Sequence, residues 1–253
     1  MMRFTRALLF CAVFAAASLG GAAPSRAVDF LVPGIALRTV SLVPGARVSY
    51  LVVSSSFGAV DSSYVELRVL KSAKGDVRLE VFSSPYPRKA AESVTVRLRL
   101  LDRVTAITSP AEFSPCLLEM LIREGTGAFR APTARERDEF DVEALFLPPG
   151  EGAVRTPLET AAISTPAGVF RCEGVRIAQR SSRVVNLGGV RAERIDEETS
   201  TVRLSSKVPF WGLVKATVEK RSTTKSSLAR PGAVSPRTTS TESTLLSFRK
   251  PRG

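Results

Sequence analysis

Histidine is absent from all 253 residues of the sequence. The absence excludes from this chain the Ser-His-Asp and Cys-His arrangements that activate nucleophiles, and it excludes histidine-ligated zinc and haem. We therefore expect a protein that is not an enzyme and that carries no metal and no cofactor. The enzymatic alternative is a hydrolase that works without histidine. The acidic runs at residues 138–143 and 196–198 are interpreted as a solvated helix end and a charged turn.

Aromatic residues are also scarce, at 7% of the chain, and Trp occurs once. Basic residues outnumber acidic ones by 36 to 24, but they are scattered along the chain and are not interleaved with aromatic residues. Surfaces that bind nucleic acids combine clustered basic residues with aromatic side chains on which bases stack. We therefore expect no nucleic-acid partner, and only a weak attraction of the net charge to anionic membrane surfaces.

Long apolar runs are missing except near the N-terminus. Residues 7–19 form an apolar run that follows Arg3 and Arg6 and precedes small residues ending at Ala27. This pattern predicts a secretory signal peptide over residues 1–27, because the run is too short to span a membrane. Its removal leaves 33 basic and 24 acidic residues and no membrane-spanning segment. We expect the mature protein to be exported, and to be periplasmic or secreted.

Cysteine occurs only three times, and Cys11 lies inside the predicted signal peptide. Cys116 and Cys172 therefore remain in an oxidising compartment, where an even pair is consistent with one disulfide that closes a loop of about 57 residues. Two separately buried thiols that act as small apolar side chains fit the sequence equally well.

The rest of the chain alternates apolar and polar residues with the period of two that β-strands require. Expected strands cover residues 47–53, 64–70, 77–82, 93–101, 159–164, 169–179, 190–196, 200–206, 213–221 and 244–248. We predict one mainly β (α+β) domain over residues 28–249. It should be a curved antiparallel sheet or half-barrel of about 8–10 strands, with one or two short helices packed on it. A flexible Ser/Thr/Arg/Pro-rich loop is expected at 222–239, and a disordered tail at 250–253.

A change of period predicts the first of these helices at residues 114–124. Ser114 is a suitable N-cap, Pro115 occupies the first helical position, and Gly125 ends the run. Leu117 and Leu121 would then lie on the apolar stripe that packs against the sheet. A second short helix is expected at 133–140.

Two stretches have an individual character. Residues 165–172 read TPAGVFRC, and residues 206–215 read SKVPFWGLVK with the only Trp, Trp211. They resemble the TPAGxFxC and VPxxGLVK stretches of exported bacterial β-rich domains, which are similar in architecture to the periplasmic lipoprotein carrier and receptor (LolA/LolB-like) half-barrel. The resemblance spans residues 40–249. It implies a curved sheet that a helical plug closes around an apolar cavity.

These observations lead to two functional hypotheses. The first is an exported, non-enzymatic binding protein that holds a lipid, an acyl chain or a lipoprotein segment in an apolar cavity. Its candidate cavity residues are Leu117, Leu121, Phe170, Phe210 and Trp211. The second is a structural or interaction module of the envelope, which binds a protein partner through a sheet edge or through the basic loop.

Overall fold

The computed structural model describes residues 37, 40–56, 58–70, 75–140, 142–147, 152–187, 190–226 and 236–250. The predicted signal peptide, the three last residues and the centre of the predicted basic loop lie outside these ranges. Among the residues described, none of the helices has the length and apolar content that a membrane crossing requires.

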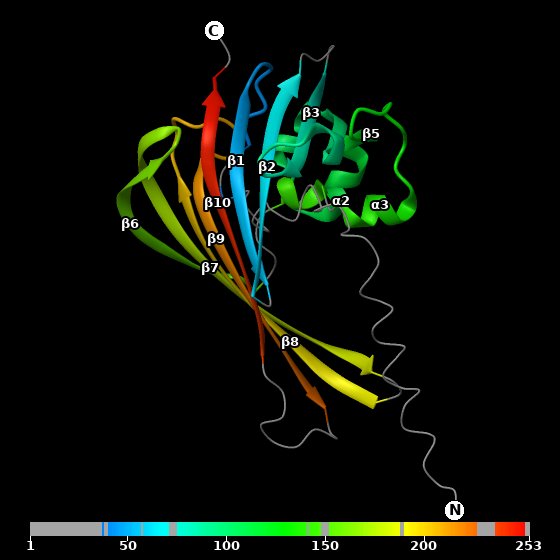
Figure 1. Ribbon diagram of the computed structural model, residues 1–253, viewed down its shortest axis with the longest axis vertical. Coiled ribbons are helices and arrows are strands. Elements are labelled where there is room, and N and C mark those ends of the chain that lie inside the picture. The colour runs from blue at the N-terminus through cyan, green and yellow to red at the C-terminus, as the bar shows by residue number, and fades with distance from the viewer. Residues whose placement is uncertain are drawn as a thin grey trace, which may run out of the picture.

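Ten antiparallel strands form one curved, unclosed sheet (Figure 1), which confirms the expected fold class. The strand order is β5-β4-β3-β2-β1-β10-β9-β8-β7-β6, so the first and last strands of the chain pair at the centre of the sheet. The strands are β1 (Arg47–Ser56), β2 (Ala59–Leu70), β3 (Asp76–Pro85), β4 (Val94–Leu101), β5 (Leu117–Glu124), β6 (Val154–Thr165), β7 (Gly168–Leu187), β8 (Val190–Leu204), β9 (Leu213–Ser226) and β10 (Arg237–Arg249).

The alternation in the sequence becomes an apolar inner face and a charged outer face in the half of the sheet from β1 to β5. In β4, for example, Val96 and Leu98 are fully buried, whereas the intervening Arg97 and the following Arg99 reach the surface. The inner face carries side chains with no exposed surface from every one of the first four strands: Val48, Tyr50, Val65, Leu67, Leu79, Val81, Val96 and Leu98. Each such side chain contributes about 1.5–3 kcal/mol through burial.

Short helical elements between β4 and β6 cover part of this inner face, beside β3 and β5 in Figure 1. They are the 3-10 helices η3 (Asp102–Ala106), η4 (Ser114–Cys116) and η5 (Val142–Leu145), with the α-helices α2 (Pro110–Phe113) and α3 (Ala134–Glu139). Phe113 and Phe146 stack with ring centroids 5.7 Å apart and join the core together with Leu145. The layer is filled by these side chains, so in this half the sheet and its cover form a packed core.

The predicted helix at 114–124 is wrong, because only Ser114–Cys116 is helical there and Leu117–Glu124 is strand β5. Met120 and Ile122 enter the core opposite Leu98 and Val96 of β4. The apolar residues of this segment fit a helical stripe and a strand face alike, and pairing with the otherwise open edge of β4 decides for the strand. The second predicted helix is confirmed as α3, which starts from a capping box between Thr133 and Glu136.

In the other half of the sheet the strands are longer than expected. One strand, β8, covers the predicted strand at 190–196 and residues 200–204 of the predicted strand at 200–206, so the predicted turn at Asp196–Glu198 is wrong. These carboxylates are instead paired with cations along the sheet: Asp196 with Arg194, Glu197 with Arg180, and Glu198 with Lys220. The outer parts of the predicted loop at 222–239 belong to β9 and β10. Figure 1 shows β7, β8 and β9 extending as a twisted ribbon beyond the rest of the sheet.

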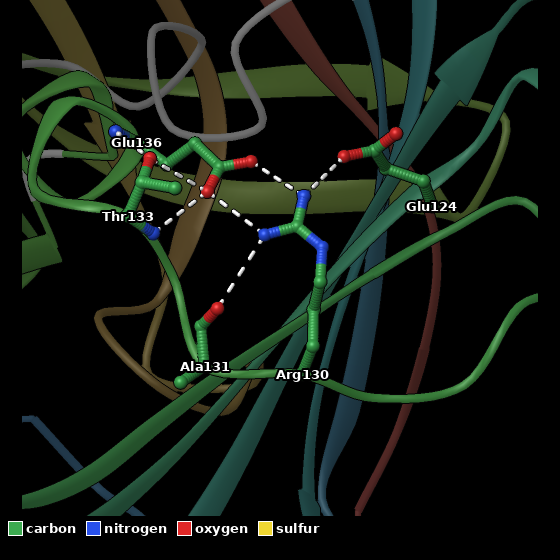
Figure 2. A network of polar contacts seen from close by, with 5 residues as sticks. All are labelled: Glu124, Arg130, Ala131, Thr133 and Glu136. Carbon is green, nitrogen blue, oxygen red and sulfur yellow. Dashed lines mark hydrogen bonds and ion pairs between the residues drawn. The ribbon is translucent and has the colours of Figure 1, made fainter.

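The two edges of the sheet are treated differently. At β5, the backbones of Ile122 and Arg130 exchange hydrogen bonds of 2.8 and 2.9 Å, so the chain folds back along this edge. Figure 2 shows how Arg130 is fixed, because its guanidinium donates to Glu136 at 2.6 and 2.9 Å and to Glu124 at 2.7 Å. At β6, by contrast, no strand of the described residues pairs with the outer edge.

Candidate functional site

The connection between β8 and β9 forms a tight loop, Ser205–Gly212, at one end of the sheet. The backbone N–H of Ser205 donates to the carbonyl of Gly212 at 2.8 Å, and Val208 N–H donates back to Ser205 at 3.2 Å. Gly212 has φ +80°, and a Cβ atom there would lie 2.7 Å from the carbonyl oxygen of Ser205. Only glycine therefore fits where the loop closes.

Phe210 lies in this loop with φ +63°, the one non-glycine residue with positive φ among those described. Such a conformation costs about 1–2 kcal/mol for an L-residue. Two contacts hold it: Ser41 N–H donates to its carbonyl at 3.3 Å, and its ring stacks on Trp211 with centroids 5.7 Å apart. Segment 40–46 therefore lies against the loop at Ser41, and Val40 and Leu42 of this segment are buried.

A pocket of about 330 Å³ opens between segment 40–46 and the loop, and we call it the loop pocket. Its lining combines apolar residues, serine hydroxyls and one cation: Ser41, Val43, Ala46, Ser205, Ser206, Val208, Pro209, Phe210, Trp211, Gly212 and Lys250. Trp211 is 1% exposed, and its indole Nε1 has no hydrogen-bond partner among the described residues. A buried donor without an acceptor costs about 1–3 kcal/mol, so an acceptor oxygen that reached this N–H would stabilise the loop.

Charged residues gather on the outer face of the sheet, near the same end. Glu80 is 3% exposed and receives hydrogen bonds from Arg68 on one side, at 2.7 Å, and from Arg97 on the other, at 2.6 Å. Burial opposes its ionisation, yet the hydrogen bonds from Arg97 and Arg68 outweigh burial and lower the pKa of Glu80. Glu66, also buried, accepts from Arg47 and from the hydroxyl of Tyr64.

The predicted cavity residues are not brought together. Phe210 and Trp211 both line the loop pocket. Phe170 is buried elsewhere in the core, where its ring meets Phe248 edge-on at 5.7 Å. Leu117 and Leu121 lie on β5, and neither lines the loop pocket. Leu121 is opposite Arg97 and so belongs to the charged face, because the strand replaced the predicted helix.

Cys116 and Cys172 are both buried free thiols, so of the two sequence readings the structure has separate thiols rather than a disulfide. Burial raises the pKa of the Cys172 thiol, which a Coulombic interaction with Arg203 partly offsets. Both side chains act as small apolar residues of the core.

The acidic runs do not form a carboxylate site among the residues described. Asp141 lies outside the described residues, and Asp196, Glu197 and Glu198 are spread along one strand with separate cations. Across the part of the chain that the structure describes, there is no group of three or more Cys, Asp and Glu residues placed to hold a metal ion.

No protein-family model matches this sequence, and neither does any curated protein. The solved structures that are similar include the following two. One is a protein from Bacteroides fragilis, described as exported and as having a YmcC-like fold, with 11% identity and a TM-score of 0.30 over 83% of this chain and 100% of that chain. The other is a protein from Parabacteroides distasonis, described as a lipoprotein, with 12% identity and a TM-score of 0.30 over 84% and 100%. At these TM-scores the similarity supports no argument about function, and the expected likeness to the lipoprotein carriers stays a prediction.

Proposed function

We propose that this chain is an exported, non-enzymatic binding protein that holds the apolar part of a lipid or an acyl chain in the loop pocket. The observation that supports the proposal most is that Trp211, whose buried N–H has no acceptor among the described residues, lines a pocket together with Val43, Val208 and Phe210. A fatty acid or an acyl ester supplies both an apolar chain for the apolar lining and an oxygen for this donor.

The size of the loop pocket sets the scale of the ligand. Its 330 Å³ is at the lower end of the range of about 300–1,000 Å³ that is typical of small-molecule sites. Beside β1–β5, the helical elements pack their own side chains into the inner face of the sheet. The ligand is therefore held by one end, with the remainder of its chain outside the protein.

The only Trp of the chain is a built-in reporter for this proposal. The delipidated mature protein is titrated with dodecanoic acid and with monododecanoyl glycerol below their micelle concentrations, while Trp211 emission is followed. We expect a saturable change of emission with a stoichiometry of one. Extraction of protein purified without delipidation, followed by mass spectrometry, should return an acyl species.

Two exposed valines provide a matched pair of variants. Val43 is 44% exposed and lines the loop pocket, whereas Val60 is 65% exposed on β2 and does not. Val43→Phe should narrow the pocket and weaken binding of both probes at least tenfold, and Val60→Phe should leave it unchanged. Binding that neither substitution alters, or no saturable change at all, contradicts the proposal.

The open edge of β6 favours a second candidate function, which is binding of a protein partner by strand addition. β6 is twelve residues long, its side chains are mostly exposed, and Val154 and Val169 beside this edge are 64% and 69% exposed. An extended segment of a partner can pair with such an edge. Pro157 and the irregular pairing between Leu158 and Ala161 interrupt it, which leaves Ala161–Thr165 as the regular stretch.

A photo-crosslinking side chain at Ser164 tests the second candidate, with one at Glu119 of β5 as control. We expect defined protein adducts in envelope extracts from position 164 alone. Equal adducts from both positions, or none, would contradict strand addition without affecting the lipid titrations.

A further inference from the structure

Three arginines occupy one row of the outer face. Arg47 of β1 is directly opposite Arg249 of β10 on one side and Arg68 of β2 on the other. Residues that face each other in this way have Cβ atoms about 4.5–5.5 Å apart, and like charges in such positions repel. We call these residues the arginine row.

Elsewhere on the same face, the chain places carboxylates between its arginines. Glu80 lies between Arg68 and Arg97 in the same row of the sheet. Farther along the face, Asp76 is buried and paired with Arg99. This alternation of charge stops at Arg68, and no acidic residue lies between it and Arg249.

The ion pairs available to the arginine row do not balance it. Arg47 uses Nη2 for Glu66, and Arg68 uses Nε and Nη2 for Glu80, which it shares with Arg97. Arg249 makes no ion pair with any described residue, and its side chain is exposed. Four guanidinium groups therefore face two carboxylates, and the excess positive charge lies at the Arg249 end.

The row also borders a pocket of about 410 Å³. Its lining is Pro44, Gly45, Ala46, Arg47, Arg68, Val69, Leu70 and Arg249, with no acidic residue. The side chains of Arg47 and Arg68 are 46% and 48% exposed, so each keeps N–H donors available beside its ion pair. Three guanidinium groups around a space of this size present donors in the geometry that oxyanions accept.

We propose that the arginine row binds a phosphate-type oxyanion, either a free phosphate or the phosphate of a lipid head group. The bound anion supplies the missing negative charge between Arg249 and Arg68. The site does not depend on the function proposed for the loop pocket. The two pockets share Ala46, however, and Lys250 of the loop pocket follows Arg249 directly, so both open at the same end of the sheet.

Calorimetry with the mature protein at low ionic strength tests the proposal, using inorganic phosphate in one arm. The other arm measures sedimentation with vesicles of phosphatidylcholine, with and without phosphatidylglycerol. The test variant is Arg249→Gln, which breaks no ion pair of the described residues. The control is Arg176→Gln, which removes the same charge from an exposed position on β7.

We expect Arg249→Gln to weaken anion binding at least tenfold and Arg176→Gln to leave it within twofold. Phosphate binding alone assigns the site to the free anion, and vesicle binding that needs phosphatidylglycerol assigns it to the lipid head group. Without any anion, Arg249→Gln should raise the melting temperature slightly, because one like-charge contact is lost. Equal effects of the two substitutions indicate attraction by net charge only and overturn the proposal, as does the absence of binding in both arms. Dodecanoyl glycerol has no charge, so its titration of Trp211 separates a failure here from a failure of the loop pocket.

Discussion

The tight closure of the β8–β9 loop at Gly212 should make the protein sensitive to any side chain at that position. In Gly212→Ala, the new Cβ lies 2.7 Å from a backbone carbonyl oxygen of Ser205, and the residue keeps φ +80°. The positive φ costs about 1–2 kcal/mol, and relief of the overlap by a shift of the loop costs about 1–3 kcal/mol. Alanine also lowers the conformational entropy of the unfolded chain, which stabilises the folded protein by about 0.4–1 kcal/mol. We expect a net loss of about 3 kcal/mol in the free energy of unfolding.

Gly58→Ala is the matched control. Gly58 has φ +81°, but nothing lies within 4 Å of the Cβ position. It therefore carries the conformational cost alone, about 1 kcal/mol after the gain from the unfolded chain. In a protein of this size, 1 kcal/mol corresponds to about 2–4 °C in melting temperature.

The assay is thermal unfolding followed by circular dichroism, together with the emission of Trp211. Gly212→Ala should lower the melting temperature by about 6–12 °C and alter the emission, and Gly58→Ala should lower it by about 2–4 °C without that change. Equal melting temperatures for the two variants would refute the reasoning, because the contact with Ser205 would then have no energetic weight.

Three further predictions concern charges and thiols. Glu80→Gln should lower the free energy of unfolding by about 2 kcal/mol, because Arg68 and Arg97 lose a charged acceptor but are partly solvated. Urea unfolding at pH 7 measures this loss, and a change below about 0.5 kcal/mol contradicts the prediction. The hydrogen bond from Arg130 lowers the pKa of Glu136 to about 2. The stability that the ionised Glu136 contributes is therefore complete above its ordinary pKa of 4.5 and is lost as pH falls from 4.5 towards 2. The Thr133 amide resonance should shift over that window, and a shift centred above pH 4.5 refutes the prediction. Cys116 and Cys172 should react with a thiol reagent only after unfolding, and dithiothreitol should leave the melting temperature unchanged, whereas a lower value would indicate a disulfide.

Strands could be predicted where burial on one face imposes a period of two. Tyr64–Leu70 and Val94–Leu101 alternate strictly, and both are strands in the structure. The segment at 117–124 could not be read in the same way, because Leu117, Leu118, Leu121 and Ile122 form a helical stripe, whereas the buried strand face is formed by Met120 and Ile122. What decides its conformation is the edge of β4, a neighbour that the local sequence does not reveal.

The candidate site could also be predicted only in part from the sequence. Pro209, Trp211 and Gly212 stand out in the sequence, and the local pattern was enough to single out Phe210 and Trp211. Contacts between residues far apart in the chain decide the rest of the site. They place segment 40–46 against the β8–β9 loop, and they set the register that aligns Arg47 with Arg249. Single arginines in alternating strands gave no signal of a shared row, because register is fixed by pairing and not by composition.

The unequal edges of the sheet also limit how copies of this protein can assemble. A fibril grows only if every added subunit offers a free edge for the next one. Here the chain's own backbone at Arg130 pairs with Ile122 and obstructs the β5 edge at that point, and the Glu124–Arg130–Glu136 cluster holds Arg130 in place. Two copies that join through β6 would consume both of their open edges, so this mode of association ends at a pair.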